Sequence, residues 1–318
     1  MTANSVNDNS KIKSKNNKKR FNRTKNLKLF SMTVPGLAVL ALFAYLPMFG
    51  VIVAFKNFRY TDGIIGSPWT GFDNFQLLFK SADAVRILRN TLLYNAWFIA
   101  LDMICAVLVA ILLFQITRRA AIKFYQTAML IPHFVSWVIV SYIVYIFLSP
   151  DNGLINNIIA ALGGEKIQWY ADSKYWPVIL TIAKEWKGIG MNCIMYYAVL
   201  IGMDTELLEA AEVDGAGKIR QIWHIMIPTL VPTMIILGIL AVGNIFRGDF
   251  GLFYQVPRNI GALYETTDVI DTYVYRALRS GNVGISAATG LFQSVVGLFT
   301  IWGVNTIVRK IDPERAMF

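Results

Sequence analysis

The chain has 318 residues, of which 55% are hydrophobic and 16% charged, and its formal net charge is +10. Soluble domains carry about a quarter of charged residues. The shortage of charge and a mean hydropathy of +0.49 therefore exclude an ordinary soluble domain and indicate a membrane protein. The two cysteines, Cys105 and Cys193, both lie in apolar segments, a position that argues against a disulfide framework or a metal site.

The first 29 residues form a basic, polar tail without an apolar period. Nine Lys or Arg lie between residues 11 and 28, directly before a long apolar run. Under the positive-inside rule such a tail stays in the cytoplasm, and we expect residues 1–29 to be disordered there, close to anionic lipid. The placement indicates a membrane partner for this charge, and no nucleic acid. A cleaved signal peptide is the alternative, but the apolar run over 31–55 is too long for one.

Six apolar segments are long enough to cross a bilayer, which needs about 20 residues of helix. We therefore predict an all-α fold over residues 30–318, a polytopic membrane protein with six transmembrane helices. The predicted spans cover residues 31–55, 91–114, 127–148, 177–203, 228–246 and 285–308.

Basic residues in the short loops predict the orientation of these spans. They place both termini and the loop around 204–228 in the cytoplasm. The loops at 56–90 and 247–284, with the shorter one at 150–176, then face outward. The basic residues that follow the second, fourth and sixth spans are Arg118, Arg119, Lys123, Lys218, Arg220, Arg309 and Lys310.

The fourth span contains a charged cluster, Lys184-Glu-Trp-Lys187. One interpretation is a pair of lysines that extend to the outer interface beside an interfacial Trp. The other is a set of residues that line a wet cavity, since charged groups within spans usually face the interior of a helix bundle.

Catalytic motifs are missing from the sequence. Gly217-Lys218 resembles the end of a phosphate-binding Walker A loop, but Glu212 stands where the first glycine is needed and Ile219 stands where Ser or Thr is needed. We therefore expect that the chain is not an enzyme and that it binds no cofactor itself.

The segment 204–228 joins the fourth and fifth spans and reads as two short helices. Asp204 or Thr205 is placed to cap the first helix, and Gly215 permits a left-handed end. A second helix is expected to start near Ala216, and Pro228 suits the first turn of the fifth span. Taken by its physics alone, the segment is an amphipathic hairpin at the membrane interface that connects two spans.

The same segment resembles the EAA loop of ABC importer permeases. That pattern is Glu-Ala-Ala, three residues, Gly, nine residues, Ile, one residue and Leu-Pro. This chain has Glu209-Ala-Ala211, Gly215, Ile225 and Ile227-Pro228, so that Ile227 in place of Leu is the one departure. The resemblance implies that the segment couples the permease to an ATPase. The coupling residues are then Glu209, Ala210, Ala211, Asp214, Gly215 and Pro228.

The resemblance covers about residues 30–318 and implies a type I importer fold with several partners. These are a second homologous permease in a heterodimer, two copies of a cytoplasmic ATPase that binds the ATP and Mg²⁺, and an extracellular binding lipoprotein. The segments 248–255 and 267–276 resemble the carbohydrate branch, which includes the maltose-type permeases and Gram-positive permeases for complex oligosaccharides. An oligosaccharide is therefore the implied substrate. The alternatives are an amino-acid or peptide ABC permease and, further away, an ion-coupled secondary carrier.

Polar and aromatic residues inside the spans are the candidates for a sugar pathway, because sugars bind to aromatic faces and hydrogen-bonding groups. The candidates form three pairs, and the two members of each pair lie three or four residues apart and so share a helix face. The alternative is that the polar groups join helices by hydrogen bonds and that the Trp lies in an interfacial belt. The candidates are His133, Trp137, Asn192, Tyr196, Asn244 and Arg247.

Overall fold

The structure, a computed structural model, describes residues 29–311, so the predicted tail over 1–29 lies almost entirely outside the described residues. The chain divides into two compact units, residues 1–53 and 54–318. The described part of the first unit belongs to one apolar helix, Leu29–Phe55, which has 27 residues and a mean hydropathy of 2.4. This helix is long and apolar enough to cross a membrane, as predicted for the first span.

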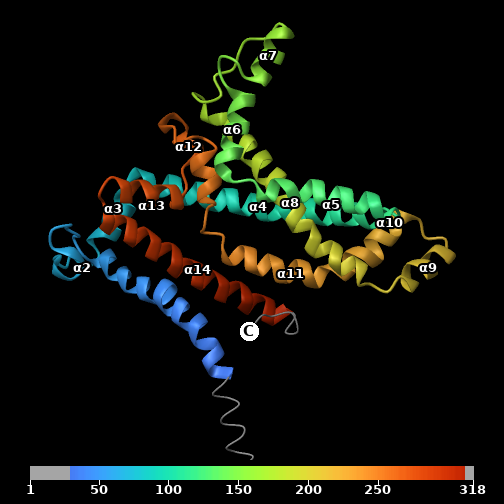
Figure 1. The fold of residues 1–318 in the computed structure, drawn as a ribbon, viewed down its shortest axis with the longest axis horizontal. Coiled ribbons are helices and arrows are strands. Elements are labelled where there is room, and N and C mark those ends of the chain that lie inside the picture. The colour runs from blue at the N-terminus through green and yellow to red at the C-terminus, as the bar shows by residue number, and fades with distance from the viewer. Residues whose placement is uncertain (1–28, 312–318) are drawn as a thin grey trace, which may run out of the picture. The chain divides into compact units, whose positions relative to one another are not determined.

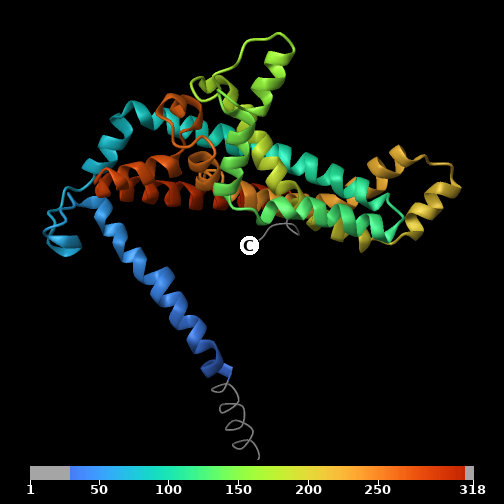
Figure 2. The same ribbon diagram turned by 45° about the horizontal axis from the view of Figure 1, so that its top comes forward.

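The second unit is built from five longer helices, with shorter ones at its edges (Figures 1 and 2). Helix α8 packs along both α4 and α5, and α11 packs against α14, α4 and α8. The longer helices are α4 (Ala82–Phe114), α5 (Arg119–Phe134), α8 (Trp176–Ile201), α11 (Ile227–Gly243) and α14 (Val283–Ile311). The shorter ones are α2 (Gly63–Gly66), α3 (Asp73–Lys80), α6 (Trp137–Leu148), α7 (Leu154–Ala161), α9 (Glu206–Val213), α10 (Lys218–Gln221), α12 (Tyr264–Thr267) and α13 (Ile270–Arg279).

Four helices in the described part of the chain meet the length and hydropathy expected of a membrane span, and a bent pair would make a fifth. These four helices contain the predicted first, second and sixth spans and the fifth as far as Gly243, three residues short of its predicted end. The predicted fourth span is a single helix, α8, whose charged cluster keeps it outside this apolar class. The structure thus agrees with an all-α membrane fold, and the total of six spans stays a prediction.

The predicted third span, residues 127–148, is not one continuous helix. Helix α5 ends at Phe134, α6 begins at Trp137, and the two helices are bent by 98°. Pro132 in the last turn of α5 cannot donate a backbone hydrogen bond. The side chain of Ser136 then caps the new helix by accepting a hydrogen bond from the backbone N–H of Ile139 at 3.4 Å. The break opens a space between α5, α6 and α8.

The close approach of α5 and α8 depends on a glycine. A Cβ at Gly190 of α8 would overlap the backbone of Met129 and Leu130 in α5. Further along the bundle, Ala110 of α4, Leu200 of α8 and Leu230 of α11 are fully buried in one apolar core. This core fixes α8 between its neighbours and so positions the polar groups on the face of α8 toward the break.

Candidate coupling segment and substrate cavity

The predicted coupling segment begins with a capped helix, α9, at one end of the bundle (Figure 1). The carboxylate of Asp204 accepts a hydrogen bond of 3.0 Å from the backbone N–H of Glu206, whereas Thr205 makes no side-chain cap. Of the two predicted caps, Asp204 is therefore the one that the structure contains. Acidic residues in the first turn of α9, Glu206 and Glu209, also lie near the positive end of its dipole.

Helix α9 ends at the predicted glycine. Gly215 has a φ of +77°, in the left-handed region. Its N–H donates to the carbonyl of Glu212 at 3.0 Å, and the N–H of Ala216 donates to the carbonyl of Ala211 at 2.8 Å. This pair of bonds is a Schellman motif, which closes a helix at a left-handed residue. The amide of the buried Gln221 donates to the carbonyl of Ala216 at 2.9 Å and braces the turn.

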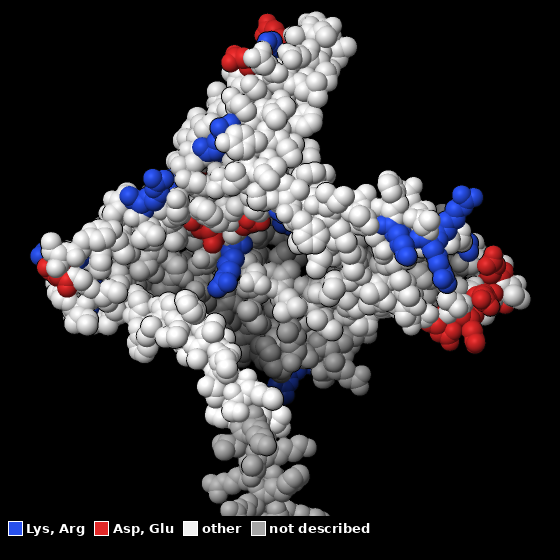
Figure 3. Space-filling view, in the orientation of Figure 1, with Lys and Arg blue, Asp and Glu red and all other residues white. Residues whose placement is uncertain are grey.

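The surface of α9 is open. Val213 is 88% exposed, Leu207 is 56% exposed, and Glu209 and Ala210 are also exposed. Figure 3 shows acidic side chains gathered at this end of the molecule, with basic side chains beside them. The exposed acids of the segment are Asp204, Glu206, Glu209, Glu212 and Asp214, and the exposed bases nearest in the chain are Lys218 and Arg220.

A continuous helical run connects the segment to the fifth span. Helix α10 starts at Lys218, two residues after the predicted position, and runs without a break to Gly243. A π-helical turn at Ile222–Met226 lies just before Pro228, in the first turn of α11. Because Pro228 has no N–H to donate to the preceding turn, irregular helix is expected there. A movement of α9 would thus be passed to a membrane helix through one turn.

Three of the six predicted pathway residues line one cavity of about 440 Å³ at the break between α5 and α6. We call it the substrate cavity, after the substrate pathway that the sequence predicts for these three residues. It lies between the end of α5, the start of α6 and the middle of α8. Its lining consists of His133, Val135, Ser136, Trp137, Lys184, Lys187, Gly188, Asn192 and Asp249.

Both lysines of the charged cluster in α8 line this cavity. The ammonium of Lys184 pairs with the carboxylate of Asp102 in α4 at 2.8 Å, and the two side chains are 22% and 23% exposed. The other oxygen of Asp102 accepts a hydrogen bond of 3.0 Å from the amide of Asn192. Lys184 therefore lines a cavity, as the second interpretation of the cluster predicts. A salt bridge and a hydrogen bond join α4 and α8 here.

Lys187 donates hydrogen bonds to backbone carbonyls at the end of α5. Its ammonium donates to the carbonyls of His133 and Pro132, and it lies 5.4 Å from the centre of the Trp137 ring. The last carbonyls of a helix carry partial negative charge, so a cation stabilises them. A cation over an indole face is also attracted by the ring. Lys187 thus holds together the two helices on either side of the break.

Trp137 is positioned by the segment that follows α11. Its Nε1 donates a hydrogen bond of 3.0 Å to the carboxylate of Asp249. A Cβ at Gly251 would overlap the indole ring, so the glycine leaves the space in which the ring lies.

The segment 267–276, which resembles the oligosaccharide permeases, contains a buried ion cluster. The side chain of Asp268 has no exposed surface, and its carboxylate pairs with Arg276 at 2.6 Å and with Arg86 of α4 at 3.0 Å. Thr272 donates to the other oxygen of Asp268 at 2.8 Å. Asp271 accepts a hydrogen bond of 2.6 Å from the backbone N–H of Gly248. These residues therefore fasten α13 to α4 and to the segment behind the substrate cavity.

Comparison with known proteins decides the class. Residues 102–313 match the family described as the binding-protein-dependent transport system inner membrane component. The chain belongs to this permease family.

Named relatives agree with this assignment. Protein LplB of Bacillus subtilis (strain 168) is 37% identical to the permease over 287 residues, 90% of each chain. The polygalacturonan/rhamnogalacturonan transport system permease protein YteP of the same organism is 35% identical over 287 residues, 90% of this chain and 89% of the relative. In the crystal structure of a bacterial ABC transporter involved in the import of the acidic polysaccharide alginate, one chain has a TM-score of 0.83 and 31% identity, over 91% of this chain and 97% of that chain.

These findings confirm the resemblance and the type I permease fold. The protein is a membrane-embedded permease subunit of an ABC importer, a kind of subunit that is not itself an enzyme. The alternative of an ion-coupled carrier is wrong. Within residues 29–311, no group of three or more His, Cys, Asp or Glu is placed to hold a metal ion.

The remaining pathway candidates of the permease lie outside the substrate cavity. Tyr196 lines a neighbouring cavity of about 230 Å³, which Asn192 also lines. The amide of Asn244 donates to the carbonyl of Leu240 in its own helix at 3.0 Å. Arg247 has an exposed side chain, and its carbonyl accepts a hydrogen bond of 3.0 Å from Asn95. Asn244 and Arg247 thus line neither of the two cavities that the other four candidates line.

Sequence reasoning missed Asp102, beside the cavity, and the partner of Asp249, which lines it. Asp102 lies in the middle of the apolar second span, and such an isolated charge within a span is itself a signal of a functional or paired site. Asp249 lies only two residues beyond the candidate Arg247. Its role depends on a partner 112 residues away in the chain, and no local pattern points to that partner.

Proposed function

We propose that the permease imports an oligosaccharide and that the sugar passes the substrate cavity at the break between α5 and α6. The observation that carries this proposal is the composition of the cavity. It combines an indole, Trp137, with an amide, Asn192, and with the charged groups of Lys187 and Asp249. Aromatic faces and fixed hydrogen-bonding groups are what a polyhydroxylated ligand needs. The names of YteP and of the alginate transporter support the same substrate class.

The proposed complex contains a second homologous permease, two copies of a cytoplasmic ATPase and an extracellular binding lipoprotein. The alginate transporter was solved in complex with an alginate pentasaccharide-bound periplasmic protein, which supports the delivery of sugar by a binding protein. The exposed helix α9 supports a docked ATPase, with Glu209, Ala210, Ala211 and Asp214 on or beside the docked surface. ATP and Mg²⁺ then belong to the ATPase.

The proposed location is the cytoplasmic membrane of a Gram-positive bacterium, with both termini and α9 in the cytoplasm. Relatives in Bacillus subtilis support the source, and the basic short loops support the orientation. Residues 1–29 form the cytoplasmic tail in this arrangement, and residues 30–318 form the permease domain.

Uptake by the purified complex tests the substrate class. The complex is reconstituted in proteoliposomes with its binding protein outside and ATP inside. It is then offered labelled neutral oligosaccharides, uronate oligosaccharides, dipeptides and amino acids. We expect ATP-dependent uptake of an oligosaccharide only. Uptake of a dipeptide or an amino acid, with no uptake of any sugar, would assign the permease to the amino-acid and peptide class.

A further inference from the structure

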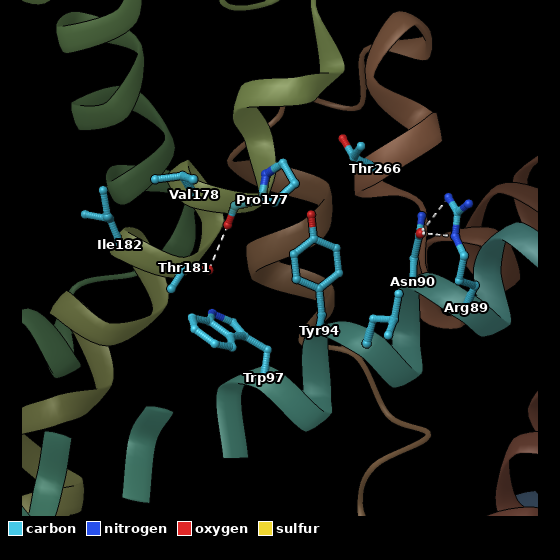
Figure 4. Close-up of a pocket in the computed structure, with 10 residues that line it drawn as sticks. Arg89, Asn90, Tyr94, Trp97, Pro177, Val178, Thr181, Ile182 and Thr266 are labelled. Carbon is cyan, nitrogen blue, oxygen red and sulfur yellow. Dashed lines mark hydrogen bonds between the residues drawn. The ribbon is translucent and has the colours of Figure 1, made fainter. Parts of the chain in front are cut away.

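Another cavity, of about 590 Å³, lies between the first half of α4 and the first two turns of α8 (Figure 4). We call it the α4–α8 cavity. It shares no lining residue with the substrate cavity. Its lining consists of Arg89, Asn90, Leu93, Tyr94, Trp97, Pro177, Val178, Thr181, Ile182 and Thr266.

The lining changes from polar to apolar along the helix axes. In Figure 4, Arg89 and Asn90 lie toward one side of the cavity, and Trp97 lies beside the α8 residues on the other side. A helix rises 1.5 Å per residue, so Trp97 lies about 12 Å further along α4 than Arg89. The deeper wall is apolar and open, with Leu93, Val178 and Ile182 each 63% exposed. In the proposed orientation both helices start at the outer surface, so the polar part lies near the headgroups and the apolar part lies in the hydrocarbon.

Two polar groups of the lining are available to a ligand. Tyr94 is 8% exposed, and its hydroxyl has no hydrogen-bond partner among the described residues. Figure 4 shows this hydroxyl in the cavity, between Pro177 and Thr266. The guanidinium of Arg89 donates to the side-chain oxygen of Asn90 at 3.2 Å and to the backbone carbonyl of Glu265 at 3.3 Å. Within residues 29–311, no carboxylate lies within 4.0 Å of the Arg89 guanidinium.

We propose that the α4–α8 cavity binds an anionic phospholipid of the outer leaflet. The phosphate pairs with Arg89, an ester carbonyl accepts a hydrogen bond from the hydroxyl of Tyr94, and an acyl chain lies along Leu93, Trp97 and Ile182. An unpaired cation close to an apolar wall matches an amphiphile with an anionic head. A sugar would leave its hydroxyls against that wall without hydrogen-bond partners. The inference rests on the proposed orientation of the chain, but not on the identity of the transported substrate.

Photo-crosslinking tests this lipid site in the assembled complex. The complex is placed in nanodiscs of phosphatidylcholine that contain a trace of either phosphatidylglycerol or phosphatidylcholine with a diazirine in the acyl chain. Labelled peptides are then mapped by mass spectrometry. We expect the phosphatidylglycerol probe to label residues 93–97 and 178–182 about fivefold more than the other probe, which corresponds to roughly 1 kcal/mol for one basic residue at an anionic lipid surface. Equal labelling by the two probes would overturn the proposal without any mutation.

Variants assign the preference to its residues. Arg89→Gln should remove the preference for phosphatidylglycerol, and Arg89→Lys should keep it. Tyr94→Phe should lower labelling by both probes. The matched control is Arg59→Gln, which changes another exposed arginine of an outward loop and should alter nothing. An unchanged preference in Arg89→Gln overturns the proposal. So do crosslinks from a photoreactive side chain at Leu93 to the partner permease, because a protein helix would then fill the cavity. Labelling needs no transport, so failed sugar uptake does not affect this test.

Discussion

The indole of Trp137 and the carboxylate of Asp249 are joined by a hydrogen bond of 3.0 Å. The bond ties the first turn of α6, just after the break, to the segment that follows α11. It also fixes the ring near Lys187, whose ammonium donates a hydrogen bond to the carbonyl of His133 at the end of α5. One wall of the substrate cavity is therefore held by three segments far apart in the chain, and a change in any of them should reach the cavity.

Gly251→Ala should disturb this wall. Its Cβ would overlap the ring of Trp137, so either the ring or the backbone must shift. Overpacking of this kind costs about 1–3 kcal/mol, and we expect a lower melting temperature of the complex and reduced sugar uptake. Gly290→Ala is the matched control, because a Cβ at Gly290 of α14 meets no atom within 4 Å. Equal behaviour of the two variants would show that the ring position does not matter.

Asn192→Ala and Asn244→Ala should differ, although the sequence alone predicts a role for both residues. Asn192 lines the substrate cavity and bonds to Asp102, whereas the amide of Asn244 returns to its own helix. We expect weaker sugar uptake in Asn192→Ala and normal uptake in Asn244→Ala, with both complexes assembled. Uptake assays on purified complexes check this, and the reverse order would place the pathway elsewhere.

Gly215→Val should uncouple the permease from its ATPase. Gly215 has a φ of +77°. At such a φ a residue with a side chain is strained by roughly 1–2 kcal/mol, and the β-branched Val is strained most. Helix α9 would then be displaced together with Glu209. We expect normal pairing with the partner permease, but loss of ATPase co-purification or of the hydrolysis that loaded binding protein stimulates.

Two further variants complete this comparison. Gly217→Val is the control, since Gly217 has an ordinary φ of −65° and open space around it. Glu209→Lys, which reverses an exposed charge of α9, should reproduce the defect of Gly215→Val. Normal co-purification and normal stimulated hydrolysis in both Gly215→Val and Glu209→Lys would refute the docking role of α9.

Asp268→Asn should destabilise the outer part of the permease. The substitution leaves the guanidiniums of Arg86 and Arg276 without the fully buried carboxylate between them. Removal of one partner from a buried ion cluster lowers the free energy of unfolding by about 3–5 kcal/mol. Because both arginines are partly exposed, we expect a loss of stability at the lower end of this range. Asp172→Asn breaks the exposed pair with Lys174, which solvent screens, and should leave the melting temperature unchanged. Thermal unfolding of the complex in detergent compares the two variants.

The orientation predicts which positions a membrane-impermeant thiol reagent reaches in intact cells. In a chain without Cys105 and Cys193, a single cysteine at position 152 or 262 should be labelled from outside, and one at position 217 should not. Position 217 lies in the turn after α9, and the other two lie in the loops at 150–176 and 247–284. Labelling at position 217 would reverse the orientation and also place the α4–α8 cavity in the inner leaflet.

The sequence by itself determined the class of this protein and most of its helices. Long apolar runs predict membrane-spanning helices, because a backbone in lipid must form all its hydrogen bonds within the helix. The ends of helix α9 were also predictable from the sequence. A cap at Asp204 and a left-handed turn at Gly215 depend only on a few neighbouring residues. The fixed spacing of the residues in the coupling segment then indicated the permease family.

Only the tertiary structure decided where the third span breaks and which polar groups meet there. A proline in a span is compatible with a straight or a broken helix, and the outcome depends on whether another segment satisfies the freed carbonyls. Lys187 does so here for the carbonyl of His133, 54 residues earlier in the chain. The roles of Asp102 and Asp249 were undecided for the same reason, because a buried charge is stabilised by its partners, and these partners lie on other helices.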